Sequence, residues 1–520
     1  MGELVGMLKA NRTRLATLAV LVVLFVTAVQ GMETKDWVIT VMRGLSIGMV
    51  TFLVAAGLSL ILGLMDVLNL AHGEMFMIGA YVGWTVFVRP DTFVDVLPPL
   101  LLVTVGFVLL PLWRVWLSRL QLAGRVAQLW PWAALLLGLV VLSVTFARFP
   151  IAIWDPEVYS ESPITFSLAL SQNNLVLPDA PAFTLSPLLV LPGVVLGGVL
   201  MALAVAGWQM RKQVGMMPDQ VGRGPVITAV IFLIFGLLIH FTNDALTGWL
   251  LAMSTTARFF LAMSVATGVG FVLGGLMEMT LIRPLYDRPI YQLMLTLGVS
   301  FIGIEMVRTV WGRPEFTMPK AAIFSGSGDA CPATNIGDLI ANQCSTIFLF
   351  DGRIRSYNEV FIIVVGLVVL LTVWLLLQRT RIGMIIRAGV QDSEMVEALG
   401  INVRRVFTFV FALGVGLAAL GGILAAPSIG LSTDMGTRLL LSALIALAIG
   451  GLTSFPGAAA GAILVGLLQQ FIIKYGQIGI NLPFLAEPFK PSPPLVPAST
   501  VLLMVIILLI LPGGLFGRNE

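Results

Sequence analysis

Side chains that could carry out chemistry are few in this sequence. Its 520 residues contain two histidines, His72 and His240, and two cysteines, Cys331 and Cys344. Such a small set offers little material for a zinc, haem or iron–sulfur site, so we expect no metal and no cofactor. No nucleophile–base–carboxylate set and no paired-carboxylate motif stands out either. An enzyme is therefore the least favoured class of function, and no residue is assigned a catalytic role.

Charged residues inside apolar stretches could instead serve an ion or proton pathway. They are sparse here. Glu305 and Arg308 lie three residues apart and could neutralise each other on one helix face. Glu278 stands near the end of its apolar stretch, where it could reach the membrane interface. This scarcity disfavours an ion-coupled carrier.

Polar residues also interrupt the apolar pattern at 69–74 and again at 427–436. A broken helix at membrane depth exposes backbone groups that could hold a zwitterionic ligand. A plain turn between two helices is the alternative, and it is favoured for 427–436. The residues predicted to line the pathway or form a gate are Asn69, His72, Gly73, Glu74 and Glu305.

The overall composition explains why so few charges occur. Hydrophobic residues make up 58% of the chain and charged residues 11%, whereas charged residues are about a quarter of an average soluble domain. Such a chain has too few charges to cover the surface of a water-soluble fold. The formal net charge of +3 comes without a basic cluster, so nucleic acid is not an expected partner. The composition predicts a protein that crosses the lipid bilayer several times.

The apolar runs predict an all-α polytopic membrane protein with about 12–14 membrane segments, since about 20 apolar residues span a bilayer. The segments at 74–88 and 438–453 are short enough to be re-entrant. The segment at 15–31 is interpreted as a retained helix, because no clear cleavage site follows it; a signal peptide is the alternative. The predicted segments are 15–31, 37–63, 74–88, 98–113, 128–146, 187–207, 225–241, 259–281, 291–311, 359–378, 406–428, 438–453, 457–475 and 499–512.

The distribution of Lys and Arg predicts which loops face the cytoplasm. It places 147–186 and 312–358 outside and 379–405 inside. Cys331 and Cys344 both lie in the second outer loop, where disulfides persist, so we expect a bond between them; two unpaired thiols are the alternative. The segment 379–405 has the pattern of two amphipathic helices around a polar turn. The pattern alone leaves open whether it lies on the membrane surface or docks a soluble partner.

Five motifs occur in an order that resembles the permeases of branched-chain amino-acid ABC importers. They are NLAHGEMFMIGAY at 69–81, EMTLIRPLYDRP at 278–289, the run 379–414, AIGGLTSFPGAAAG at 448–461 and LPGGLFGR at 511–518. The resemblance covers roughly 36–88 and 259–518. It implies an ABC importer permease core in the bacterial cytoplasmic (inner) membrane.

The division of the chain follows from this resemblance. The predicted parts are an extra N-terminal helix at 1–36, a first core part at 37–88, inserted membrane segments at 89–258 with the loop 147–186, and a second core part at 259–520. The insertion adds four helices, an even number, and so leaves the topology of the core unchanged.

The resemblance also implies partners: two cytoplasmic ATPase subunits, a second permease subunit and an extracytoplasmic solute-binding protein. None of the six lysines follows a glycine, so the chain has no phosphate-binding P-loop of its own. The segment 379–405 resembles the family's coupling loop to the ATPase. The residues expected to carry the coupling are Arg387, Gln391, Asp392, Glu397 and Gly400.

The leading hypothesis is a permease subunit of an ATP-driven importer for branched-chain amino acids or similar small solutes. It would pass substrate from the binding protein by alternating access. A stand-alone secondary carrier or channel is the alternative, and it would work without nucleotide. A permease for urea or short amides is the second alternative, because the binding protein sets much of the specificity in such systems.

Overall fold

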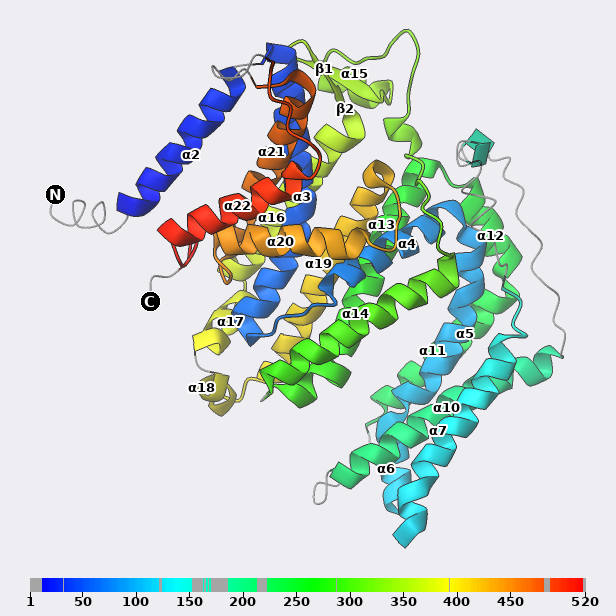
Figure 1. The fold of residues 1–520 in the computed structure, drawn as a ribbon. Helices are drawn as coiled ribbons and strands as arrows, with labels where there is room; N and C mark the ends of the chain where they lie inside the picture. Colours follow the sequence, from blue (N-terminus) through cyan, green and yellow to red (C-terminus); the bar gives the residue numbers. More distant parts are fainter. Residues whose placement is uncertain are drawn as a thin grey trace. The chain divides into compact units, whose positions relative to one another are not determined.

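The structure is a computed structural model that describes residues 12–30, 32–120, 124–151, 162, 165–166, 168–169, 186–212, 222–286, 288–391, 393–480 and 487–517 (Figure 1). The chain divides into two compact units. Unit 1 comprises 1–84, 156–168 and 255–520, and unit 2 comprises 85–155 and 169–254. Unit 2 therefore consists mostly of the segment 89–258, and unit 1 consists mostly of the two chain stretches that flank it.

Unit 1 is built almost entirely of helices. Its elements are α2 (Arg12–Gln30), α3 (Thr34–Met65), α4 (His72–Val88, with its last turn in unit 2), α13 (Thr255–Met277), η1 (Glu278–Ile282), η2 (Arg283–Leu285), α14 (Pro289–Trp311), η3 (Ala322–Phe324), α15 (Ile336–Ala341), β1 (Thr346–Leu349), β2 (Gly352–Arg355), η4 (Ser356–Phe361), α16 (Ile362–Arg379), α17 (Arg381–Gln391), α18 (Ser393–Ala398), α19 (Val403–Ile429), α20 (Met435–Gly450), α21 (Phe455–Ile478) and α22 (Leu495–Ile510).

Unit 2 contains six helices in the described part of the chain: α5 (Pro90–Val108), α6 (Leu110–Ser118), α7 (Gly124–Phe146), α10 (Pro187–Lys212), α11 (Gly224–Phe241) and α12 (Asn243–Ala252). Helix α10 packs on α5 and α7, where Gly198 lies against Val103 and Gly197 against Leu142. At the start of α5, Arg89 and Asp91 form a buried ion pair, with Nε and Oδ1 2.9 Å apart. Most of the loop 147–186 lies outside the described residues.

The predicted all-helical fold class is confirmed. Among the described residues, ten helices are long and apolar enough to cross a membrane. The other four of the fourteen predicted segments form α2, α4, α20 and α22. Helices α20 and α22 have 16 residues each, which at 1.5 Å per residue gives about 24 Å, less than a hydrocarbon core of about 30 Å.

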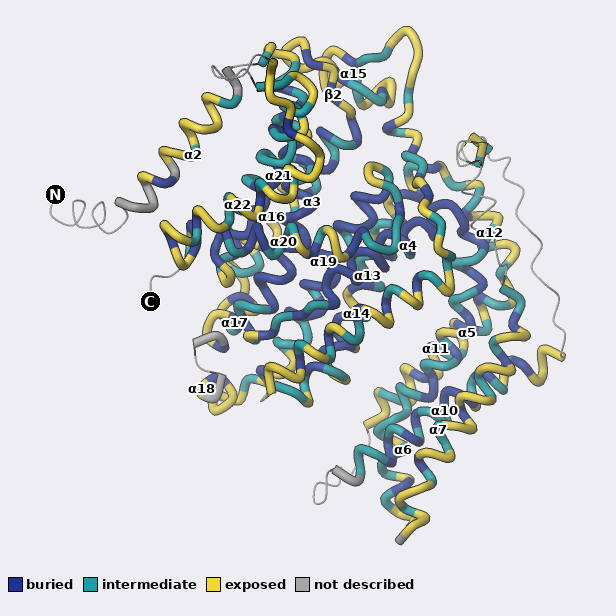
Figure 2. Tube along the Cα trace, in the orientation of Figure 1, coloured by how far each residue is buried: buried dark blue, intermediate teal, exposed yellow. Residues whose placement is uncertain are grey.

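Helices α3 and α19 form the centre of unit 1, and both are buried along most of their length (Figure 2). Small residues permit the close packing around them, as expected for helices in lipid. A Cβ added at Gly48 of α3 would lie 2.9 Å from the Cα of Ile463 in α21. At Gly274 of α13 it would lie 3.0 Å from the Cα of Ala412 in α19. The core therefore depends on glycine where helix backbones meet.

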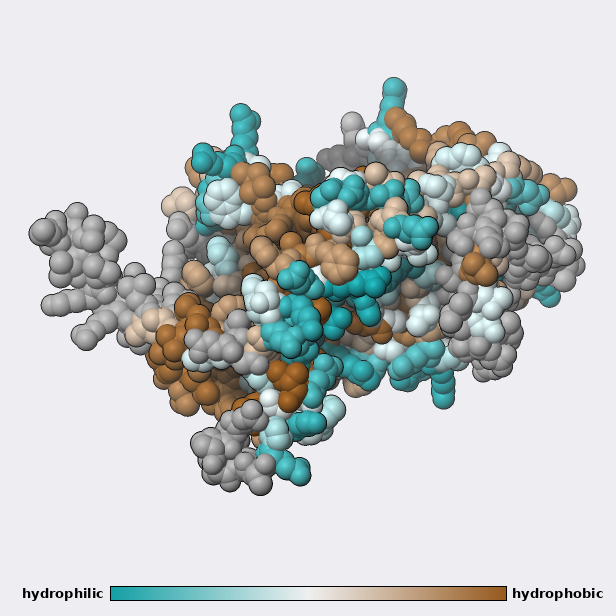
Figure 3. Space-filling model, turned by 90° about the horizontal axis from the view of Figure 1, so that it is seen from above, coloured by the Kyte–Doolittle hydropathy of each residue, from teal (hydrophilic) through white to brown (hydrophobic). Residues whose placement is uncertain are grey.

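The loop 312–358 forms a small structured cap at one end of unit 1. Strands β1 and β2 pair antiparallel with Thr346 opposite Arg355, an element that the sequence did not predict. A disulfide joins Cys331 and Cys344, whose Cα atoms are 5.5 Å apart. Buried Cys344, Ile347 and Ile354 pack on Val38 of α3. The cap is thus fixed to the beginning of α3. We call this end of unit 1 the disulfide end; Figure 3 looks onto it and shows hydrophilic side chains between hydrophobic areas.

Replacing Cys331 and Cys344 together by serine is expected to loosen this cap. The bridge spans 13 residues, and closing a loop of that size contributes about 3 kcal/mol in the chain-entropy model. Limited proteolysis of the detergent-solubilised chain should therefore cut within 312–358 faster in the variant. A reductant should accelerate cleavage of the wild type and leave the variant unchanged. Equal cleavage of both proteins in oxidising buffer would contradict the prediction.

Candidate functional site

The first candidate region is the break between α3 and α4. Helix α3 ends at Met65, and the next residue, Asp66, adopts the left-handed conformation with φ 52°. The Oδ1 atom of Asn69 accepts a hydrogen bond from the backbone N–H of Ala71 at 3.1 Å. The N–H of Leu70 donates to the hydroxyl of Thr296 on α14 at 3.3 Å. Side chains rather than helical hydrogen bonds therefore hold this break in place.

Buried polar residues follow at the start of α4. Glu74 is only 1% exposed, and its Oε1 atom accepts hydrogen bonds from Ser300 of α14 at 2.6 Å and from Thr437 of α20 at 3.3 Å. Its Oε2 atom has no hydrogen-bond partner among the described residues. His72 is fully buried and packs on Gly57 of α3, where an added Cβ would lie 2.8 Å from Nε2.

The second predicted break, at 427–436, lies beside the first, at 69–74. A short turn from Gly430 to Asp434 joins α19 to α20. A Cβ added at Gly73 would lie 2.5 Å from the carbonyl oxygen of Gly436. In the turn, a hydrogen bond from Ser432 and the charge of Arg438 lower the pKa of Asp434 below its ordinary value.

The structure thus brings four of the five predicted pathway or gate residues together: Asn69, His72, Gly73 and Glu74. They form a tightly packed junction of α3, α4, α14 and α20 rather than the wall of an open channel. Glu305 lies apart from them on an exposed face of α14, with its side chain 64% exposed and paired to Arg308 at 2.7 Å. The role of all five in a pathway stays a prediction.

A cavity of about 420 Å³ opens within unit 1 between α3, η4, α19, α20 and α21. We call it the outer cavity, because the parts of α3, η4 and α19 that line it lie near the disulfide end of unit 1. Its lining combines charged, amide, hydroxyl and aliphatic side chains. The lining residues are Arg43, Ser46, Ile47, Val50, Arg355, Asn358, Glu359, Ile362, Ala425, Ser428, Ile429, Leu439, Gln469 and Gln470.

An ion pair organises the polar wall of the outer cavity. Glu359 is 2% exposed, and its Oε1 atom lies 3.1 Å from Nε of Arg43. Its Oε2 atom accepts a hydrogen bond from the backbone N–H of Arg355 at 2.5 Å. The Arg43 side chain remains 46% exposed. Both carboxylate oxygens are therefore engaged, while the guanidinium stays accessible.

Neither Arg43 nor Glu359 is among the site residues predicted from the sequence. Arg43 lies within the predicted segment 37–63 and Glu359 begins the segment 359–378, so each could have been noted as a charge in or beside a membrane segment. Their pairing was not predictable, because 316 residues separate them along the chain.

The third candidate region is the hairpin α17–α18 at the other end of α16. Ile386 and Val396 are buried, whereas Arg387 and Glu397 are exposed. Gly400 ends the hairpin with φ 81°, a conformation that favours glycine. The Gln391 side chain and all of Asp392 lie outside the described residues. Helix α17 contacts α3, α16 and α19, so the apolar side of the hairpin rests on the core.

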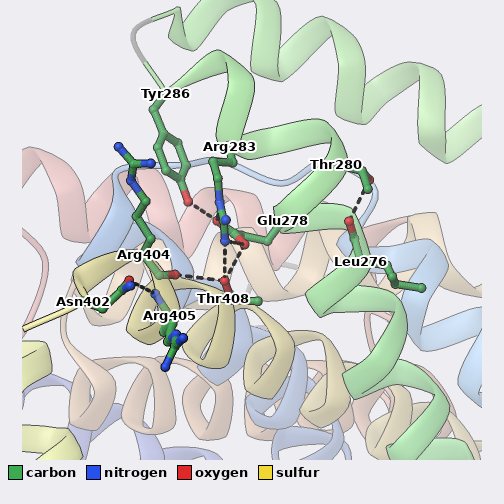
Figure 4. Close-up of polar contacts among 9 residues, drawn as sticks. All are labelled: Leu276, Glu278, Thr280, Arg283, Tyr286, Asn402, Arg404, Arg405 and Thr408. Carbon is green, nitrogen blue, oxygen red and sulfur yellow. Dashed lines mark hydrogen bonds and ion pairs between the residues drawn. The ribbon is translucent and has the colours of Figure 1, made fainter. Parts of the chain in front are cut away.

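A buried network lies near the start of α19 (Figure 4). Glu278 is fully buried and forms an ion pair with Arg283, whose Nη2 lies 2.8 Å from Oε2. The hydroxyl of Tyr286 also donates to Glu278. Thr408 of α19 donates to Oε2 at 2.7 Å and accepts a hydrogen bond from Arg283 at 2.6 Å.

This network corrects one expectation. The sequence suggested that Glu278 reaches the membrane interface, but the structure buries its carboxylate between η1, η2 and α19. The partners Arg283 and Tyr286 follow within eight residues, whereas Thr408 is 130 residues away. The network therefore fixes the end of α13 to the first turns of the helix that follows the hairpin.

Comparison with known proteins identifies the family. The model for "Branched-chain amino acid transport system / permease component" matches residues 194–511, more than half of the chain. The match begins within the predicted insertion.

Individual relatives agree with the family match. The chain is 24% identical over 331 residues to the high-affinity branched-chain amino acid transport system permease protein LivH of Escherichia coli (strain K12), covering 63% of this chain and 94% of LivH. It is 28% identical over 192 residues to the permease protein BraD of Pseudomonas aeruginosa, covering 37% and 56%. It is also 30% identical over 192 residues to the fructose import permease protein FruF of Bifidobacterium longum, covering 34% and 50%.

No solved structure matches the chain. The predicted resemblance is confirmed by the family match, which is to transport permeases rather than to enzymes. Together with the ten candidate spans in the described part, these findings identify a multi-pass membrane protein that belongs to the permease family of branched-chain amino acid ABC transporters.

Proposed function

We propose that this chain is the permease subunit of an ATP-driven importer in the bacterial inner membrane that moves branched-chain amino acids or similar small solutes by alternating access. Two cytoplasmic ATPases would drive it, a second permease subunit would complete the pathway, and an extracytoplasmic binding protein would deliver substrate. The names of LivH and BraD support amino acids. The name of FruF says that this relative imports fructose, a different class of solute.

The observation that carries this proposal is the placement of the hairpin α17–α18. It presents the exposed Arg387 and Glu397, rests on the core through α17, and leads through Asn402 directly into α19. Helix α19 is buried along most of its length and ends at the outer cavity. A partner that moved the hairpin would therefore act on the centre of the permease.

The coupling role is tested by reversing the charges of Asp392 and Glu397 to lysine. Because like charges facing each other in an interface cost several kcal/mol, and 1.4 kcal/mol corresponds to a factor of ten, we expect ATPase co-purification and ATP-driven uptake to fall by about tenfold or more. The measurement is uptake in proteoliposomes that contain the complete transporter. The folded subunit should remain in the membrane at its normal level.

A matched control is Asp329→Lys, an exposed charge reversal in the loop that carries the disulfide. Because that loop is predicted to face away from the cytoplasm, ATPase co-purification should match the wild type. Unimpaired uptake in the Asp392 and Glu397 variant would count against the coupling role. Transport by the purified chain alone, without nucleotide or ATPase, would instead favour a stand-alone carrier or channel.

A further inference from the structure

We propose that the outer cavity is a binding site for a small aliphatic solute that bears a carboxylate, with Arg43 and Arg355 as the groups that bind this carboxylate. The inference rests on the proposed function and names the class of solute that the permease recognises. It concerns residues of this chain and not the separate binding protein.

The charges in the cavity favour a carboxylate. Arg43, Arg355 and Glu359 contribute two positive charges and one negative charge, so the lining carries an excess of one positive charge. Glu359 already accepts from Arg43 and from the backbone of Arg355 with its two oxygens. It therefore acts as a positioning residue that orients the Arg43 guanidinium.

Arg43 retains donors for a ligand. Its hydrogen bond to Glu359 uses Nε, whereas a guanidinium has five N–H donors arranged in a planar fork. This fork fits the two oxygens of a carboxylate, and such charge-assisted pairs are stronger than neutral hydrogen bonds. The half-exposed side chain of Arg43 lines the cavity, as does the exposed Arg355.

A second observation points to a hydrogen-bond donor on the solute. The Oδ1 atom of Asn358 is buried and has no hydrogen-bond partner among the described residues. A buried acceptor without a partner is unfavourable, and Asn358 lines the cavity, so a solute N–H group that met this oxygen after the amide turned toward the cavity would stabilise it. The amides of Gln469 and Gln470 on α21 line the same cavity. An ammonium group would thus find acceptors near the site of its own carboxylate.

The remaining wall is aliphatic. It includes Ile47, Val50, Ile362 and Leu439. A volume of about 420 Å³ lies within the range of about 300–1,000 Å³ usual for small-molecule sites. An aliphatic side chain could therefore be buried while the polar end of the solute faces the arginines. Urea and sugars carry no carboxylate to pair with the two arginines.

The test is ligand-dependent stabilisation of the purified full-length chain in detergent, since a solute that binds only the folded protein raises its unfolding temperature. The probes are leucine, 4-methylpentanoate, leucinamide and urea at equal concentration. We expect leucine to stabilise the chain and leucinamide and urea to have no effect. Stabilisation by 4-methylpentanoate would show that the carboxylate suffices, and its absence would show that the ammonium group is needed as well.

Two variants assign the effect to the arginines. In Arg355→Gln the backbone N–H that binds Glu359 is retained, and we expect leucine to bind about tenfold more weakly. Arg43→Gln should have at least the same effect, but it also leaves Glu359 without its ion pair. The matched control is Arg308→Gln, which removes an exposed arginine of unit 1 outside the cavity and should leave leucine binding unchanged.

Equal stabilisation by leucinamide and leucine would overturn the inference, as would unchanged leucine binding in both cavity variants. Absence of any stabilisation of the wild type by leucine or 4-methylpentanoate would do the same. Failure of the proposed function is recognised separately, because it would appear as missing ATP-driven uptake by the complete wild-type transporter.

Discussion

Glu278→Ala is expected to destabilise the folded chain by about 3–5 kcal/mol, the usual cost of removing one partner from a buried ion pair. The carboxylate accepts hydrogen bonds from Arg283, Tyr286 and Thr408 and is fully buried. Its loss would leave the Arg283 guanidinium beside an empty space without its counter-charge. Thermal unfolding of the purified chain in detergent should show the loss as a clearly lower midpoint.

The matched control is Glu305→Ala, which removes another carboxylate that pairs with an arginine close by in sequence. Glu305 and Arg308 form an exposed pair on α14, with side chains 64% and 37% exposed. Pairs of this kind contribute about 0–1 kcal/mol. If the two alanine variants unfolded at the same temperature, the Glu278 network would not stabilise the junction of α13 and α19.

Local pattern was sufficient to predict the membrane helices. Ten of the fourteen predicted segments correspond to long apolar helices among the described residues. This works because a helix in lipid forms all its hydrogen bonds within one segment, so each segment shows its own apolar composition. Five motifs in a characteristic order likewise indicated the family, and the polar residues 69–74 marked the break after α3 correctly.

Remote partners were not predictable in the same way. Glu74 receives its hydrogen bonds from Ser300 and Thr437, which follow it by 226 and 363 residues. The sequence therefore showed that 69–74 is polar, but not that folding packs these side chains into a solid junction. The outer cavity was missed for the same reason, since its ion pair joins α3 to η4.

Helix α19 packs closely against α4 at Gly422. A Cβ added at Gly422 would overlap the carbonyl oxygen of Phe76 and lie 2.9 Å from the backbone nitrogen of Ala80. A helix carbonyl cannot turn away as a side chain can, so Gly422→Ala would force the two helices apart. Overpacking of this kind typically costs 1–3 kcal/mol, and we expect about 3 kcal/mol here because the clash is with backbone.

Gly416→Ala on the same helix separates this clash from any general effect of alanine. Its added Cβ would make an ordinary contact, 3.4 Å from the carbonyl oxygen of Thr267. Alanine favours a helix over glycine by about 1 kcal/mol, so the Gly416 variant should unfold at or slightly above the wild-type temperature. The Gly422 variant receives the same gain in helix propensity and should still unfold well below the wild-type temperature. The difference between the variants therefore measures how closely α19 approaches α4, and equal unfolding temperatures would mean that the helices are not in backbone contact.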